Sequence, residues 1–128
     1  MQQPLDLKQA LAAVGYYCDD GLATEVSLLF HQDTDMIRTM LLDGPPGSGK
    51  TFLAKSVARV LDVPYVYVQA HAGSSPEDFL HDANVVTILR GAAGDRTAVK
   101  NPEDVISLGF LPTVFRASHN GKVIAFVD

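Results

Sequence analysis

The sequence predicts one α/β domain with a parallel sheet. Apolar runs of strand length alternate with segments of helical periodicity, in the order strand, Gly-rich turn, helix, strand, helix, strand. This alternation is typical of a parallel sheet with helices on its faces. With 128 residues, 47% of them hydrophobic, the chain is long enough for one domain with a core and too short for two.

The first half of the chain predicts two helices and a strand. Leu22, Val26 and Leu29 follow the cap residues Asp19 and Asp20 at helical spacing, which predicts a helix of about 10 residues. The elements that follow are a short buried strand over residues 36–43, running straight into the glycines, and a helix packed closely on a sheet over residues 49–61.

The second half of the chain predicts three further strand regions and two helices. β-branched and aromatic residues predict strands, and a proline followed by acids predicts the first turn of a helix. The elements expected are a strand over 63–69, a short helix from Ser75 through about His81, a β-hairpin insertion over 85–99 around a Gly-containing loop, a helix starting at Pro102 and interrupted at Gly109 and Pro112, and a buried strand, KVIAFVD, ending in Asp128.

Composition excludes several classes of protein. Ten basic against 15 acidic residues give a net charge of −5, so we expect neither nucleic acid nor an anionic membrane as a partner. No apolar stretch approaches about 18 residues, and the N-terminus lacks an apolar core, so neither a membrane span nor a signal peptide is expected. One cysteine, Cys18, excludes an internal disulfide and suits a reducing, cytoplasmic compartment.

One motif carries chemistry. Residues 44–51, GPPGSGKT, fit G-x-x-x-x-G-K-[ST], a loop whose backbone N–H groups surround a phosphate chain at a helix N-terminus. Gly47 and Gly49 allow conformations that a Cβ would block, Lys50 can reach the β and γ oxygens, and the Thr51 hydroxyl can ligate Mg²⁺. The alternative is an ordinary Gly/Pro turn. The predicted cofactor-binding residues are Gly44, Pro45, Pro46, Gly47, Ser48, Gly49, Lys50, Thr51 and Phe52.

Asp128 ends the last apolar strand, where an acidic residue of a nucleotide site usually holds Mg²⁺. By itself a strand-terminal Asp is more often a helix cap or a turn, and the upstream loop favours the metal role with Thr51. His31, His71, His81 and His119 show no metal-ligand spacing. Arg90, Arg96 and Lys100 are better explained as a solvated hairpin than as a steering surface, and Cys18 has no histidine nearby in sequence that would make it a nucleophile.

The combination GPPGSGKT and KVIAFVD resembles the AAA+ ATPases. GYYCDDGLATEVSLLF, SSPEDF with the insertion after it, and LGFLPTVFRASHNGKVIAFVD are similar to MoxR-type AAA+ proteins of the dynein-related, helix-2-insert group, over residues 14–128. The resemblance implies a P-loop NTPase fold of the ASCE class, a three-layer sandwich. It also implies ATP and Mg²⁺ as ligands, a protein client and a homo-hexameric ring.

The resemblance also implies residue roles. Gly47 to Thr51 would bind phosphates, and Thr51 with Asp128 would hold Mg²⁺. Tyr16, Tyr17 and Cys18 lie where such families line the adenine pocket, and the alternative for the two tyrosines is core packing. Residues 70–75 would face the pore of a ring, or form a plain surface turn.

The departures from the family pattern lie after Asp128. The glutamate that polarises the attacking water, the sensor residues, the arginine finger, the helical lid and one sheet strand are not among these residues. We therefore expect a partial module, from a longer ATPase or a truncated product, that binds nucleotide weakly and does not turn it over. Its expected parts are 1–35, 36–61, 62–122 and 123–128. The alternatives are a small P-loop kinase and a nucleotide-binding module without turnover.

Overall fold

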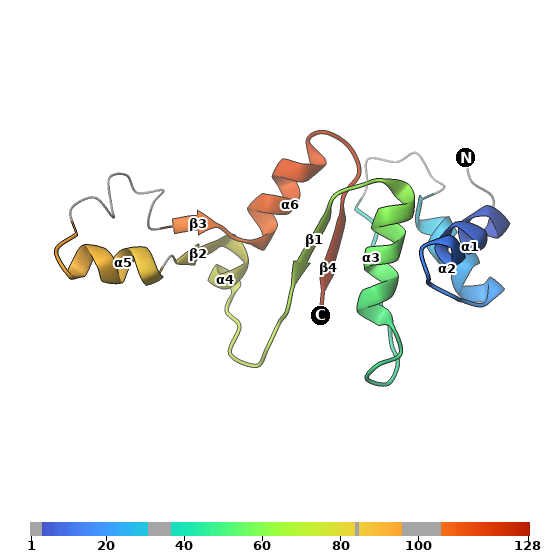
Figure 1. The fold of residues 1–128 in the computed structure, drawn as a ribbon, viewed down its shortest axis with the longest axis horizontal. Helices are drawn as coiled ribbons and strands as arrows, with labels where there is room; N and C mark the ends of the chain where they lie inside the picture. The colour runs from blue at the N-terminus through green and yellow to red at the C-terminus, as the bar shows by residue number, and fades with distance from the viewer. Residues whose placement is uncertain (1–3, 31–36, 84, 96–105) are drawn as a thin grey trace. The chain divides into compact units, whose positions relative to one another are not determined.

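The computed structural model describes residues 4–30, 37–83, 85–95 and 106–128 (Figure 1). The chain divides into two compact units, Met1–Tyr65 and Val66–Asp128. None of the helices within the described ranges has both the length and the apolar character needed to cross a membrane.

The first unit is built from three helices, α1 (Pro4–Ala13), α2 (Asp20–Phe30) and α3 (Lys50–Leu61). The helices expected over 20–30 and 49–61 are confirmed, and α1 is an addition. α1 packs against both α2 and α3. The apolar side chains buried in this core are Leu7, Leu11, Ala23, Val26, Leu53, Ala54, Val57 and Ala58. Because two of the buried residues of α3 are alanines, the helix can approach its neighbours closely.

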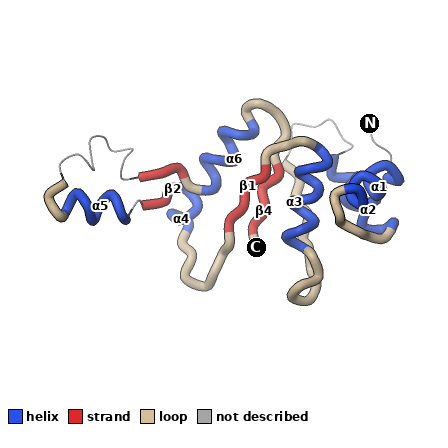
Figure 2. The backbone as a smooth tube through the Cα atoms, in the orientation of Figure 1, coloured by secondary structure: helices blue, strands red, loops and turns tan. Residues whose placement is uncertain are grey.

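The strand predicted over 36–43 is wrong for the part that the structure describes. Residues 37–43 form no strand and are drawn as loop in Figure 2. The side chains of Ile37 and Leu41 are 86% and 92% exposed, in alternation with half-buried neighbours. An apolar run becomes a strand only when a neighbour accepts its backbone hydrogen bonds, and no strand ladder of the described residues includes this segment.

The second unit contains the remaining elements. They are β1 (Tyr65–Val68), which starts at the junction, α4 (Pro76–Leu80), β2 (His81–Ala83), α5 (Val85–Ala92), β3 (Ile106–Leu108), α6 (Phe110–Ser118) and β4 (Ile124–Val127). They confirm the strand expected within 63–69, the short helix expected from Ser75 to about His81, and a terminal strand. The terminal strand is not fully buried, since half-buried and exposed residues alternate along it.

β1 and β4 form a two-stranded sheet, side by side in Figure 1. The N–H of Asp128 donates to the Val68 carbonyl at 3.0 Å, and the Asp128 carbonyl accepts from the Ala70 N–H at 2.8 Å. One residue bonded to two positions that lie two apart on its neighbour is the parallel ladder pattern, as the α/β fold predicts. β2 and β3 form a separate antiparallel pair, with His81 opposite Leu108.

The β-hairpin expected over 85–99 is wrong over its first arm, because that arm is the helix α5. Ile88, Leu89 and Ala92 are spaced as on one helix face. Two hydrogen bonds close the C-terminus, from the N–H of Asp95 to the Arg90 carbonyl and from the N–H of Gly94 to the Gly91 carbonyl, each 3.1 Å. An ion pair between Arg90 and Asp95 at 2.8 Å spans the same turn. The expected second arm lies outside the described residues.

The helix expected from Pro102 starts outside the described residues. Its expected continuation is wrong, because 106–108 is the strand β3 and a new helix, α6, begins at Phe110. Gly109 is the N-cap of α6, and Pro112 lies in its first turn, where a missing N–H costs no helical hydrogen bond. Pro112 therefore helps to start the helix that it was expected to interrupt.

Gly109 is a point of close backbone packing. A Cβ added to it would lie 2.7 Å from His81 N and from the Leu80 carbonyl carbon, and 2.9 Å from the Phe79 carbonyl oxygen. We expect Gly109→Ala to destabilise the fold by about 1–3 kcal/mol, because backbone atoms cannot move aside as a side chain can. Urea unfolding followed by far-UV circular dichroism measures the loss. Gly21→Ala is the matched control, since the added Cβ meets only Asp19 Oδ1 at 3.5 Å. Equal stability of the two variants would contradict the prediction.

Candidate phosphate-binding site

The GPPGSGKT loop turns sharply into the first turn of α3. Gly47 and Gly49 have φ of 79° and 90°, in the left-handed region that residues with a Cβ rarely adopt. The N–H of Ser48 donates to the Pro45 carbonyl at 3.2 Å, which closes the turn. The Gly49 carbonyl accepts from the Leu53 N–H at 2.8 Å, the first hydrogen bond of the helix. The two glycines therefore stand where the backbone reverses direction.

The N-terminus of α3 is suited to an anion. Its N-cap is Gly49, which has no side chain that could bond to the first helical N–H groups. Residues 44–48 are exposed, so an anion can reach these donors from solvent. The backbone N–H groups of a helix's first turn and the partial positive charge of the helix end both favour a phosphate.

The Lys50 ammonium lies against the loop itself. Nζ donates to the Gly44 carbonyl at 2.8 Å, to the Pro45 carbonyl at 3.0 Å and to Ser48 Oγ at 3.3 Å. An ammonium has three N–H donors, so these oxygens already match its full capacity. A phosphate oxygen would exchange with them and form a stronger, charge-assisted bond. The ammonium is therefore already at the loop before any anion arrives.

The two residues predicted to hold Mg²⁺ belong to different units. Thr51 is half-buried in the first turn of α3, and Asp128 directly follows β4. A hydroxyl and a carboxylate are oxygen donors of the kind that Mg²⁺ prefers. Among the described residues, no three His, Cys, Asp or Glu side chains gather into a metal cluster.

Of the three residues predicted for an adenine pocket, Tyr16 lies at the loop. Its ring centroid is 5.7 Å from that of Phe52, with the planes tilted by 53°. A Cβ on Gly49 would lie 3.5 Å from Tyr16 Cε2, so the ring covers the glycine that starts α3. Burial raises the pKa of the Tyr16 hydroxyl.

Tyr17 and Cys18 differ from Tyr16. The Tyr17 side chain is 83% exposed, whereas Cys18 is half-buried. Burial, and next the charge of Asp19, raise the pKa of the Cys18 thiol. A thiol held in its protonated form is a poor nucleophile, which agrees with the absence of a predicted catalytic role for Cys18.

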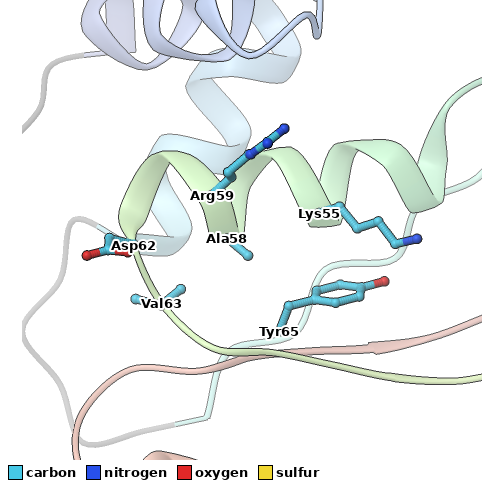
Figure 3. Close-up of a pocket in the computed structure, with 6 residues that line it drawn as sticks. All are labelled: Lys55, Ala58, Arg59, Asp62, Val63 and Tyr65. Carbon is cyan, nitrogen blue, oxygen red and sulfur yellow. The ribbon is translucent and has the colours of Figure 1, made fainter.

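A shallow pocket of about 320 Å³ lies on the C-terminal half of α3, at the opposite end of the helix from the loop (Figure 3). It is lined by Lys55, Ala58, Arg59, Asp62, Val63 and Tyr65. No residue of the predicted phosphate site lines it. The sequence analysis did not identify this pocket, and no motif in residues 55–65 would have indicated it.

Comparison with known proteins gives a family match and several curated relatives. The family model described as the AAA domain, dynein-related subfamily, matches residues 39–106. This range contains the whole loop, α3, β1, α4 and α5.

Two of these relatives are the ATP-binding ClpX subunits of the ATP-dependent Clp protease from two strains of Porphyromonas gingivalis, ATCC 33277 and W83. Each is 27% identical to this chain over 139 aligned positions, which cover 96% of this chain and 33% of the relative. The chain thus spans about a third of the length of these relatives. No solved structure matches.

Removing the Lys50 ammonium tests the site directly. We expect Lys50→Ala to weaken the binding of magnesium triphosphate nucleotide about 10- to 100-fold, the range for losing a hydrogen bond to a charged group. Displacement of a fluorescent nucleotide measures the affinity. Lys55→Ala removes the same charge from the same helix outside the loop, and should leave binding unchanged. Equal affinities for the two variants would show that the loop is not the phosphate site.

Proposed function

The chain belongs to the AAA domain family, dynein-related subfamily, and on that premise we propose that it binds ATP through residues 44–51 as part of an AAA+ ATPase. The observation that carries the proposal is the loop itself. Two glycines with left-handed backbone turn it into the N-terminus of α3, and Lys50 is bonded to three of its oxygens. This arrangement supplies backbone donors and a cation to a phosphate chain.

In this proposal the residues Gly44 to Phe52 hold the phosphates. Lys50 exchanges its bonds to the Gly44 and Pro45 carbonyls for phosphate oxygens, and Thr51 with Asp128 holds Mg²⁺. When bound, the ion would neutralise part of the negative charge of the phosphates. The protein's own contribution is orientation, since the loop conformation and the ammonium position are set before binding.

The adenine end of the nucleotide is proposed to meet the segment from Tyr16 to Cys18. Supporting this is the contact of Tyr16 with Phe52 and Gly49, because a base stacked there would be next to the phosphate loop. Tyr17 is exposed and available to a ligand from solvent. Stacking of a base on an aromatic ring contributes about 1–3 kcal/mol.

Alanine substitution distinguishes the contributions of Tyr16 and Tyr17 to ATP binding. We expect Tyr16→Ala to weaken ATP binding about 10-fold, which corresponds to the lower half of the stacking range. Its effect on inorganic tripolyphosphate, which has no base, should be small. Isothermal titration calorimetry with both ligands measures the difference, and Tyr17→Ala tests the exposed neighbour. If Tyr16→Ala weakens both ligands equally, Tyr16 supports the loop and does not contact the base.

The finer assignment is to MoxR-type proteins that act on a protein client as homo-hexameric rings. It is supported by the additional helix, α5, between the paired strands β2 and β3, and by the similarity to ClpX, the ATP-binding subunit of a protease. Residues 70–75 are the proposed pore-facing segment. Residues 70–73 are exposed, and the N–H of Ser74 donates to the His71 carbonyl to close the turn. A cytoplasmic location belongs to the same proposal, since a single cysteine suits a reducing compartment.

A further inference from the structure

Three side chains share one face of the sheet formed by β1 and β4. The rings of Tyr67 and Phe126 stack, with centroids 6.1 Å apart and planes 14° from parallel. The Tyr67 hydroxyl donates to Asp128 Oδ2 at 3.4 Å. Phe126 and Asp128 lie two positions apart, so their side chains point to the same side of the chain. All three residues belong to the second unit.

The backbone of Asp128 is already held by this sheet. Its N–H donates to the Val68 carbonyl at 3.0 Å, and its carbonyl accepts from the Ala70 N–H at 2.8 Å. These bonds place the Cα atom, whereas the direction of the carboxylate depends on rotation about χ1 and χ2. The hydrogen bond from the Tyr67 hydroxyl restrains this rotation. The stack on Phe126 orients the ring that carries the hydroxyl.

We propose that Tyr67 is a positioning residue that orients the Asp128 carboxylate toward its cation, an inference that rests on the proposed role of Asp128 in binding Mg²⁺ with ATP. A carboxylate has two oxygens and about four lone-pair sites, so a hydroxyl on Oδ2 and a metal ion can share it. Groups that hydrogen-bond to a metal ligand fix its orientation, and their removal typically lowers metal affinity about 10- to 100-fold.

Tyr67→Phe removes the hydroxyl and keeps the ring that stacks on Phe126. We expect the Mg²⁺ concentration that half-saturates Mg²⁺-dependent ATP binding to rise about 10-fold, at the low end of that range because the hydrogen bond is long. ATP affinity in EDTA should stay unchanged, since Tyr67 acts in this proposal on the ligand of the cation and not on the phosphates. Both quantities are binding constants from calorimetric titration, so no turnover is needed.

Two further variants make the result specific. Tyr65→Phe removes a hydroxyl two residues away on the same strand and should leave the Mg²⁺ requirement unchanged. Asp128→Asn should raise the requirement by itself, and adding Tyr67→Phe to it should cause no further rise, because Tyr67 acts through Asp128.

The outcomes distinguish the two levels of the argument. A normal Mg²⁺ requirement in Tyr67→Phe, with a raised one in Asp128→Asn, would overturn the role of Tyr67 and leave the proposed function standing. Additive effects of the two substitutions would also overturn it. Absence of Mg²⁺-dependent ATP binding in the unsubstituted chain would overturn the proposed function, and the role of Tyr67 with it.

Discussion

The burial of one face of α3 is the constraint on which the candidate site depends. Leu53, Ala54, Val57 and Ala58 are buried in the three-helix core, so the axis of this helix is set by packing. Lys50 is the first residue of the same helix, and therefore the end of the loop is held by the core. From that fixed point the chain must reverse within a few residues, and it does so at Gly47 and Gly49. The loop therefore loses little conformational entropy when a ligand binds.

The contacts of the Lys50 ammonium add an electrostatic contribution to the loop that helix packing positions. A cation beside loop carbonyls is a stable arrangement without any anion, because Lys50 satisfies its donors on Gly44, Pro45 and Ser48. The same carbonyls are weaker partners than a phosphate oxygen, so the exchange runs toward the anion when one is present. The ammonium thus stabilises the loop conformation and, in the proposed function, also recognises the ligand. Its exposure to solvent makes both interactions sensitive to ionic strength.

The errors made from sequence have particular physical causes. Residues 85–89 are rich in β-branched side chains, a composition that suggested a strand, whereas the spacing of Ile88, Leu89 and Ala92 and the closure at Gly94 are helical. Residues 37–43 have the apolar run of a buried strand, but burial and strand pairing both require neighbours that no local pattern can supply. In both segments the composition favours a strand, whereas the structure depends on helical spacing or on strand neighbours that composition does not describe.

The sequence by itself determined the loop, because the backbone freedom, the helix start and the cation that a phosphate needs all lie within residues 44–51. It also determined α2 and α3, whose periodicity and caps are local signals. Only the tertiary structure decided that Tyr16 covers the start of α3 and that Tyr67 meets Asp128. Those contacts join residues 33 and 61 positions apart, and they exist because helix packing and parallel strand pairing bring distant segments together.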